Sequence, residues 1–141
     1  MRDTGVNLRV AIVEDELPAR ARLRAMLREY PDLEVVGEAD SVKRGLEMLR
    51  AATPDVLFLD VRLGGGNGFE LLRMLPAPWP AVVFVTAFSD FAVRAFEVHA
   101  IDYLLKPFER SRLDECVQRL RDRAARADRG EVRELLEQAL E

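Results

Sequence analysis

The residues with the greatest capacity for chemistry come directly after four short apolar runs of the sequence. Each run is rich in branched residues and has the length of a buried strand. Because the carboxyl ends of parallel strands meet at one edge of a sheet, the polar residues that follow them would be brought together there. These residues are Glu14, Asp15, Asp60, Thr86 and Lys106.

Three of these residues are carboxylates, which points to a cation. Glu14, Asp15 and Asp60 would repel one another and shift one another's pKa unless a positive charge neutralised them. Mg²⁺ binds oxygen ligands, commonly one or two protein carboxylates together with water and phosphate oxygens. Zinc is disfavoured because no His or Cys belongs to these motifs. We therefore expect a Mg²⁺ site.

The remaining two polar residues suit phosphoryl transfer. A phosphoryl group on Asp60 would carry negative charge that Mg²⁺, the ammonium of Lys106 and the hydroxyl of Thr86 could balance. Lys43 and Lys106 are the only lysines among 21 basic residues. A lysine at this position fits a need for a compact point charge rather than the planar fork of arginine. Asp60, Lys106 and Thr86 are thus the predicted catalytic group.

The apolar runs alternate with segments of helical periodicity, which predicts an α/β fold. We expect a flavodoxin-like, doubly wound, five-stranded parallel sheet with strand order 2-1-3-4-5 and helices on both faces. The expected strands are 8–13, 33–39, 55–60, 81–86 and 102–105. The expected helices are 19–30, 41–52, 67–75, 90–98 and one that begins near 109.

Local signals mark the ends of several elements. Ser41 is a plausible N-cap, and Asn67 with Glu70 resembles a capping pair for a short helix. The segment 64–68 contains four glycines and indicates a loop between the third strand and that helix, because glycine raises the entropic cost of ordered structure. His99 and Trp79 are interpreted as structural residues, since neither has a second ligand or catalytic partner in its motif.

Composition limits the class of protein. The chain has 141 residues, 49% of them hydrophobic and 33% charged, which fits one soluble domain. The net charge of -4 gives no support for direct nucleic-acid binding, and the absence of an apolar stretch of about 18 residues predicts no membrane span. We expect a cytoplasmic protein. The domain is expected over 1–122, and 123–141 is predicted to be a helical extension, packed on the domain or serving as a linker or dimerisation helix.

With these motifs in place, the sequence resembles the receiver domain of two-component response regulators over residues 8–122. The resemblance rests on four segments: Val-Glu-Asp-Glu at 13–16, Leu-Phe-Leu-Asp-Val at 57–61, Val-Thr-Ala-Phe at 85–88 and Tyr-Leu-Leu-Lys-Pro-Phe at 103–108. The run 95–108 is similar to the branch of the family that is usually joined to a LytTR DNA-binding domain.

The resemblance implies roles for individual residues. It makes Asp60 the phosphoacceptor and Asp15 a direct Mg²⁺ ligand, with Glu14 acting through water. The backbone carbonyl of Arg62 would complete the metal site. Thr86 and Tyr103 match the pair that reports phosphorylation, and the bond between Lys106 and Pro107 matches one that is cis in the family. Two departures from the family pattern are Gly64, where proline is common, and Glu14, where aspartate is frequent.

The resemblance also implies a function. The chain would act as a signalling switch rather than an enzyme, taking its phosphoryl group from a sensor histidine kinase in a phosphorelay. It would control transcription through an output domain outside this chain and form a homodimer through the fourth helix, fifth strand and fifth helix. The alternatives are a stand-alone receiver that acts by protein binding and a phosphatase of the haloacid-dehalogenase type. The latter has its nucleophile after the first strand, whereas Asp60 follows the third.

Overall fold

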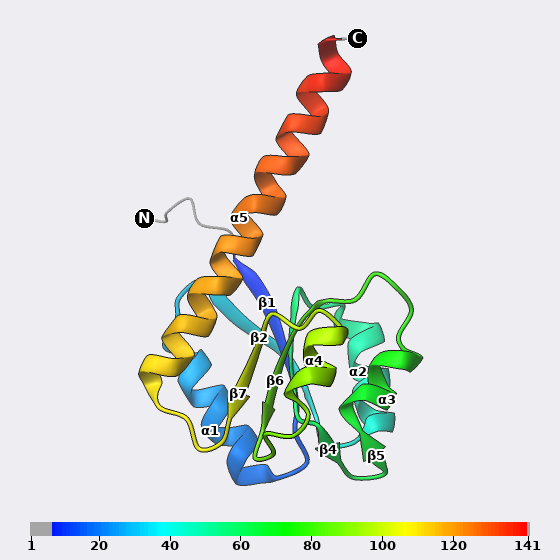
Figure 1. Ribbon diagram of the computed structural model, residues 1–141, viewed down its shortest axis with the longest axis vertical. Coiled ribbons are helices and arrows are strands. Elements are labelled where there is room, and N and C mark those ends of the chain that lie inside the picture. Colours follow the sequence, from blue (N-terminus) through cyan, green and yellow to red (C-terminus); the bar gives the residue numbers. More distant parts are fainter. Residues whose placement is uncertain (1–6, 141) are drawn as a thin grey trace.

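A five-stranded parallel sheet forms the centre of the protein (Figure 1). The computed structural model describes residues 7–140, and the side chains of these residues apart from 128–135. The strands of this sheet are β1 (Leu8–Val13), β2 (Leu33–Ala39), β3 (Val56–Leu59), β6 (Ala81–Thr86) and β7 (Asp102–Leu105). Their order is β2-β1-β3-β6-β7, which is the predicted order of 2-1-3-4-5 when only these strands are counted. The predicted fold is confirmed.

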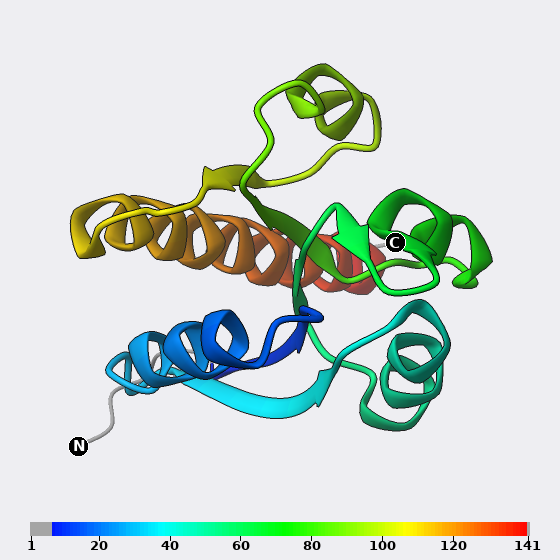
Figure 2. The same cartoon turned by 90° about the horizontal axis from the view of Figure 1, so that it is seen from below.

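Helices cover both faces of the sheet. Seen from below, α1 and α5 lie on one side of the sheet and α2, α3 and α4 on the other (Figure 2). The helices are α1 (Leu17–Leu27), α2 (Val42–Ala52), α3 (Gly68–Met74), α4 (Ala92–Glu97) and α5 (Arg110–Leu140). This three-layer arrangement is the doubly wound one that alternating strands and helices predict.

The two faces of β3 explain its unbroken apolar sequence. Phe58 points into the core formed with α1 and α5, whereas Leu57 and Leu59 point into the core formed with α2, α3 and α4. All three side chains are fully buried. A parallel strand with both faces covered cannot alternate apolar and polar residues, and β3 does not.

The expected loop at 64–68 is partly a hairpin. Two short strands, β4 (Arg62–Leu63) and β5 (Gly66–Asn67), pair antiparallel, with Gly64 and Gly65 as the turn. Gly65 has a φ of +83°, a conformation that glycine adopts without steric cost. The expectation of a loop therefore holds for the turn and is wrong for Gly66 and Asn67.

The predicted helix caps are confirmed. The Ser41 hydroxyl accepts a hydrogen bond of 3.1 Å from the backbone N–H of Arg44. The Asn67 side chain accepts from the N–H of Glu70, and the Glu70 carboxylate accepts from the N–H of Asn67, each at 2.9 Å. These bonds satisfy backbone donors that the first turn of a helix leaves free. α2 and α3 therefore begin directly after their cap residues, Ser41 and Asn67.

The last helix passes through the expected domain boundary without a break. α5 is 31 residues long and projects from the domain (Figure 1). Ala124 still packs against the core beneath α1 and α5, whereas Ala125, Leu136 and Leu140 are exposed. The side chains of Val132 and Leu135, which continue the helical apolar pattern, lie outside the described ones. Packing of α5 on the domain therefore ends near Ala124, whereas the helix itself continues to Leu140.

Within residues 7–140, none of the helices has both the length and the apolar composition that crossing a bilayer demands.

Gly68, the first residue of α3, is expected to be required by packing. A Cβ atom at Gly68 would lie 2.5 Å from the backbone oxygen of Asp60 and 2.9 Å from Leu59 Cγ, closer than van der Waals contact allows. We expect Gly68→Ala to lower the free energy of unfolding by about 1–3 kcal/mol, despite the better helix propensity of alanine. Urea unfolding measures this change. Gly64→Ala is the matched control, because a Cβ at Gly64 would have no atom within 4 Å and little loss is expected.

Candidate functional site

The carboxyl ends of four strands bring the predicted polar residues together. Glu14 follows β1, Asp60 follows β3, Thr86 ends β6 and Lys106 follows β7. One carboxylate oxygen from each of Glu14, Asp15 and Asp60 can be chosen so that all three lie within 4.8 Å of one another. The structure thus assembles the cluster that the order of strands predicted.

The ammonium of Lys106 binds two of these carboxylates. Its Nζ lies 2.6 Å from Glu14 Oε1 and 3.0 Å from Asp60 Oδ2. Glu14 and Asp60 are only 4% and 7% exposed, whereas Asp15 is exposed. Two desolvated anions therefore share one cation at the floor of the site, and the third anion stands at its rim.

Burial and charge shift the titration of this group. Loss of solvent raises the pKa of Glu14, and the nearby Asp60 charge adds to that rise against the opposing effect of Lys106. For Lys106, burial alone would lower the pKa, but its hydrogen bonds to Glu14 and Asp60 outweigh burial and raise it. The lysine is thus held in its charged form by the two acids.

Backbone groups orient the two buried acids. The N–H of Glu16 donates to Glu14 Oε2 at 3.1 Å, and the N–H of Arg62 donates to Asp60 Oδ1 at 3.3 Å. Arg20, from α1, donates a guanidinium hydrogen bond of 2.8 Å to the backbone oxygen of Glu14. Each carboxylate is therefore held at one oxygen by the backbone and at the other by Lys106.

Thr86 and Tyr103 lie near the cluster but do not bond to each other. Thr86 is fully buried, and its Oγ1 is the one buried side-chain polar atom without a hydrogen-bond partner among the described residues. The hydroxyl of Tyr103 instead donates to the backbone oxygen of Phe88. An unpaired buried hydroxyl is costly, so Thr86 has a hydrogen-bonding capacity that a ligand at Asp60 could use.

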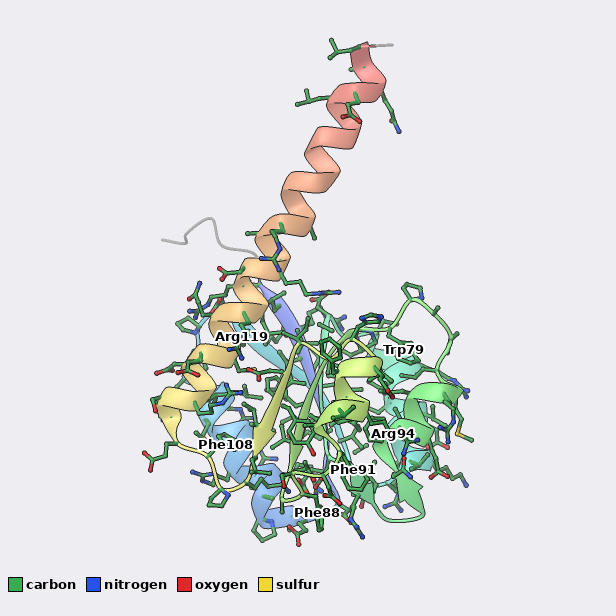
Figure 3. All side chains as sticks on the ribbon, viewed as in Figure 1. Trp79, Phe88, Phe91, Arg94, Phe108 and Arg119 are labelled. Carbon is green, nitrogen blue, oxygen red and sulfur yellow. The ribbon has the colours of Figure 1, made fainter. Side chains whose placement is uncertain are left out.

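Aromatic rings and an arginine border the site. The guanidinium carbon of Arg62 lies 4.2 Å from the centre of the Phe88 ring and 5.9 Å from that of Phe91. Figure 3 shows Phe88 and Phe91 at the end of the domain opposite to the projecting part of α5. The sequence did not predict that Arg62 and Phe88 contact each other.

The residues present fit Mg²⁺. Three hard oxygen donors meet at one point, and neither His nor Cys belongs to the cluster. One of the donors is exposed, which leaves room for the water ligands that Mg²⁺ retains. The backbone carbonyl of Arg62, the fourth expected ligand, stays a prediction.

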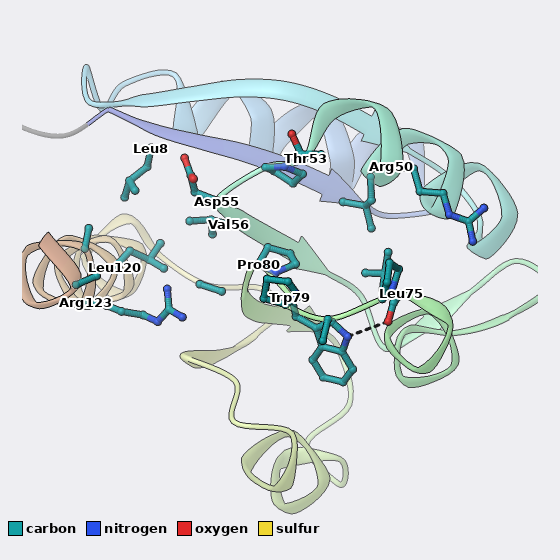
Figure 4. A pocket seen from close by; sticks show the side chains of 18 of the residues that line it. Leu8, Arg50, Thr53, Asp55, Val56, Leu75, Trp79, Pro80, Leu120 and Arg123 are labelled. Carbon is teal, nitrogen blue, oxygen red and sulfur yellow. Dashed lines mark hydrogen bonds between the residues drawn. The ribbon is translucent and has the colours of Figure 1, made fainter. Parts of the chain in front are cut away.

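One large cavity lies away from this edge of the sheet. A hollow of about 740 Å³ lies at the amino-terminal ends of the strands, between α2, α5 and the segment before β6 (Figure 4). Trp79 stands in its wall, and its indole N–H donates to the Leu75 oxygen at 3.2 Å. That bond fixes the ring and agrees with the structural role predicted for Trp79. A smaller cavity, of about 370 Å³, adjoins the site and is lined in part by Glu14 and Lys106.

The motifs did not reveal one cluster of charged side chains at the amino-terminal end of β7. Asp102, at the start of β7, receives hydrogen bonds from Arg112 at 2.5 and 3.0 Å and from Arg119 at 2.6 Å. Burial would raise the pKa of Asp102, but its hydrogen bonds and the charges of the two arginines hold that pKa below its usual value. The two arginines are seven residues apart, so they occupy the same face of a helix, and this spacing is the signal that could have revealed the cluster.

The fold and site together define a class of protein. Residues 10–118 match the family model described as the response regulator receiver domain. The chain belongs to this family, as its motifs predicted.

Named relatives narrow the branch. The chain is 43% identical to the transcriptional regulatory protein BtsR of Escherichia coli over 122 residues, which are 86% of this chain and 51% of that protein. It is 43% identical to the sensory transduction protein LytT of Bacillus cereus over 115 residues, which are 79% of this chain and 46% of that protein. Both are response regulators of the LytTR-type branch, which confirms the predicted resemblance. The chain spans about half the length of these curated relatives.

Solved structures agree with this assignment. The response regulatory domain of mrkE from Klebsiella pneumoniae aligns with a TM-score of 0.74 and 36% identity, over 80% of this chain and 94% of that one. The receiver domain of AraT from Geobacillus stearothermophilus aligns with a TM-score of 0.78 and 28% identity, over 87% and 99% of the two chains. The protein is therefore a receiver domain of a two-component response regulator, and such domains act as signalling switches.

Removing the shared cation should make stability depend on pH. In Lys106→Gln the two buried carboxylates lose their common partner, so the pKa of Glu14 should rise further. A carboxyl group whose folded pKa is raised stabilises the fold while protonated and loses that contribution as pH rises through the folded pKa. We expect the variant to lose about 1–3 kcal/mol of unfolding free energy near pH 8 and much less near pH 4. Denaturant unfolding across this range measures the loss.

Lys43→Gln is the control for this prediction, because Lys43 is the other lysine of the chain and is exposed on α2. An equal loss in both variants, or a loss in Lys106→Gln that does not change with pH, would contradict the proposed electrostatic role of Lys106.

Proposed function

We propose that Asp60 is the phosphoacceptor of this receiver domain and that a sensor histidine kinase is the donor. The observation that carries this proposal is the environment of Asp60: a 7% exposed carboxylate, bonded to Lys106 and within a cluster of three acids. A carboxylate that is desolvated and charge-balanced in this way is a nucleophile whose modification disturbs the whole cluster. The family to which the chain belongs supports the assignment.

The transfer requires little covalent machinery. A carboxylate oxygen of Asp60 attacks the phosphorus of a phosphohistidine, the new O–P bond forms and the P–N bond breaks, so that the imidazole leaves with the electron pair. Mg²⁺ held by Glu14, Asp15, Asp60 and the carbonyl of Arg62 would neutralise charge on the transferring oxygens when bound. Lys106 already lies 3.0 Å from Asp60 and would pair with the phosphoryl group without a large movement.

Thr86 and Tyr103 would report the modification. The hydroxyl of Thr86 has no partner among the described residues, so a phosphoryl oxygen on Asp60 would supply one. Movement of Thr86 would displace the segment that holds Phe88, the residue whose carbonyl accepts the Tyr103 hydroxyl. Phosphorylation would then change the population of Tyr103 orientations, because a ligand shifts an equilibrium by its differential affinity for the two states.

The message would pass to a partner through the surface formed by α4, β7 and α5. This surface carries Val93 and Phe96, which are 73% and 80% exposed. We infer that it forms a homodimer after phosphorylation and that regulation of transcription depends on an output domain outside this chain. The relatives named transcriptional regulators, which are about twice as long, support this view. The segment 123–141 would act as the connection between the two parts, in a cytoplasmic protein whose receiver portion, 1–122, does not contact nucleic acid.

Chemical phosphorylation tests the central proposal. Incubation with Mg²⁺ and a small phosphodonor such as acetyl phosphate should add one phosphoryl group, measured by intact mass. Asp60→Asn should abolish the addition, because an amide is not a nucleophile of comparable strength. Asp55→Asn is the matched control at the opposite end of β3, where the carboxylate bonds only the backbone N–H of Arg9 at 2.8 Å. Addition that survives in Asp60→Asn would overturn the assignment.

Light scattering tests the proposed dimer. A beryllium fluoride complex at Asp60, a mimic of the phosphoryl group, should raise the mass of the wild-type chain towards that of a dimer. Phe96→Glu should prevent this, because a charge would be buried in the interface. Met74→Glu, which alters a 58% exposed apolar residue on α3, should dimerise as the wild type does. An unchanged monomer in the wild type would refute this part of the proposal.

A further inference from the structure

Arg62 contacts both the proposed phosphoacceptor and the loop that follows β6. Its backbone N–H donates to Asp60 Oδ1 at 3.3 Å. Its guanidinium lies over Phe88, with Cζ 4.2 Å from the ring centre. A single residue therefore joins the carboxylate to an aromatic ring that belongs to another element.

Phe88 is held from a second side. Its carbonyl accepts the hydroxyl of Tyr103, and its ring meets that of Phe91 edge-on, with the ring centres 6.5 Å apart. Phe88 also lies only two residues after Thr86, so any shift of Thr86 towards Asp60 must be absorbed within this short segment. The position of Phe88 therefore determines where the Tyr103 hydroxyl can form this hydrogen bond.

We propose that the stack of Arg62 on Phe88 is a latch that positions Phe88, and through it Tyr103, in the arrangement described above. The proposal rests on the proposed role of Asp60 and adds a route to Tyr103 that does not pass through the Thr86 hydroxyl. A guanidinium over an aromatic face is attracted by the ring quadrupole, and at an exposed site this attraction changes an equilibrium by about 2- to 5-fold. Opening the latch should therefore lower the population of this Tyr103 arrangement by that factor.

The chain contains a matched comparison for this contact. Arg94, on α4, lies over the ring of Phe69 at 4.3 Å, nearly the distance of Arg62 from Phe88. Phe69 belongs to the same group of rings, with its centre 6.3 Å from that of Phe91. Tyr103, however, is hydrogen-bonded to Phe88 rather than to Phe69. Removing Arg94 deletes a similar cation and a similar stack without releasing the acceptor of Tyr103.

Tyrosine signals provide the measurement. The chain has two tyrosines, Tyr30 and Tyr103, so a protein made with 3-fluorotyrosine gives two fluorine resonances. Tyr30 is bonded to Asp114, far from the site, and serves as the internal reference. In the unmodified protein, Arg62→Gln should shift the Tyr103 resonance and leave that of Tyr30 in place. Arg94→Gln should shift neither.

Titration with the beryllium fluoride mimic then measures the latch as an equilibrium. At a mimic concentration that half converts the wild type, Arg62→Gln should change the ratio of the two Tyr103 signals about 2- to 5-fold. Phe88→Leu should have a similar effect, and the double variant should add little to either, because both remove the same contact. Arg62→Lys, which keeps the charge but not the planar stack, should lie between the wild type and Arg62→Gln.

Three results would overturn the latch: an unchanged Tyr103 resonance in Arg62→Gln, full additivity of Arg62→Gln and Phe88→Leu, or an equal effect of Arg94→Gln. These results are distinguishable from failure of the proposed function. If Asp60 took up no phosphoryl group, the resting-state resonances would still report the contact between Arg62 and Phe88. If Asp60 were phosphorylated but the Tyr103 resonance did not respond to Arg62→Gln, the proposed function would be supported and the latch would be refuted.

Discussion

Two carboxylates that have lost most of their water must share one ammonium, and the arrangement of this domain depends on that constraint. Glu14 and Asp60 are almost fully buried, and each is bonded to Lys106 within 3.0 Å. Burying a carboxylate without a cation is costly, because burial disfavours the charged form. The three groups form one electrostatic unit, so a change of charge at any of them alters the other two.

The sheet is the device that holds this unit together. Glu14, Asp60 and Lys106 follow three different strands, and the central strands are buried on both faces. Close packing of the two cores leaves the strand ends little freedom, which keeps the charges at hydrogen-bonding distance. Gly68 also helps to position Asp60, because its missing side chain lets the start of α3 approach the backbone of Asp60. The packing that stabilises the fold therefore also sets the distances between the charged groups.

Much of this could be predicted from the sequence, because it depends on patterns of short range. The buried strands were visible as unbroken apolar runs, and the caps at Ser41 and Asn67 follow rules that span three residues. The convergence of the polar residues then followed from the geometry of parallel strands alone. The proposed roles of Asp60, Thr86 and Tyr103, by contrast, rest on the family to which the chain belongs and are to be tested by experiment.

What could not be predicted depends on how separate elements meet. The hairpin of β4 and β5 needs a positive φ at Gly65 and a bridge from Gly64 to Ser41, neither of which a run of glycines specifies. The stack of Arg62 on Phe88 depends on how β4, which contains Arg62, and the segment after β6, which contains Phe88, lie relative to each other. The point at which α5 leaves the domain depends on tertiary packing, because the helix itself continues past it in a segment rich in good helix formers such as arginine, alanine and glutamate.

The continuity of α5 beyond the domain has a mechanical consequence. From Ala125 to Leu140 the helix rises about 24 Å beyond its last packed turn, at about 1.5 Å per residue. A straight helix of this length would act as a lever arm about the contact between α5 and the sheet. A tilt of about 5° at that contact would carry the tip through about 2 Å. Displacements too small to matter inside the domain would thereby become large at the end of the helix.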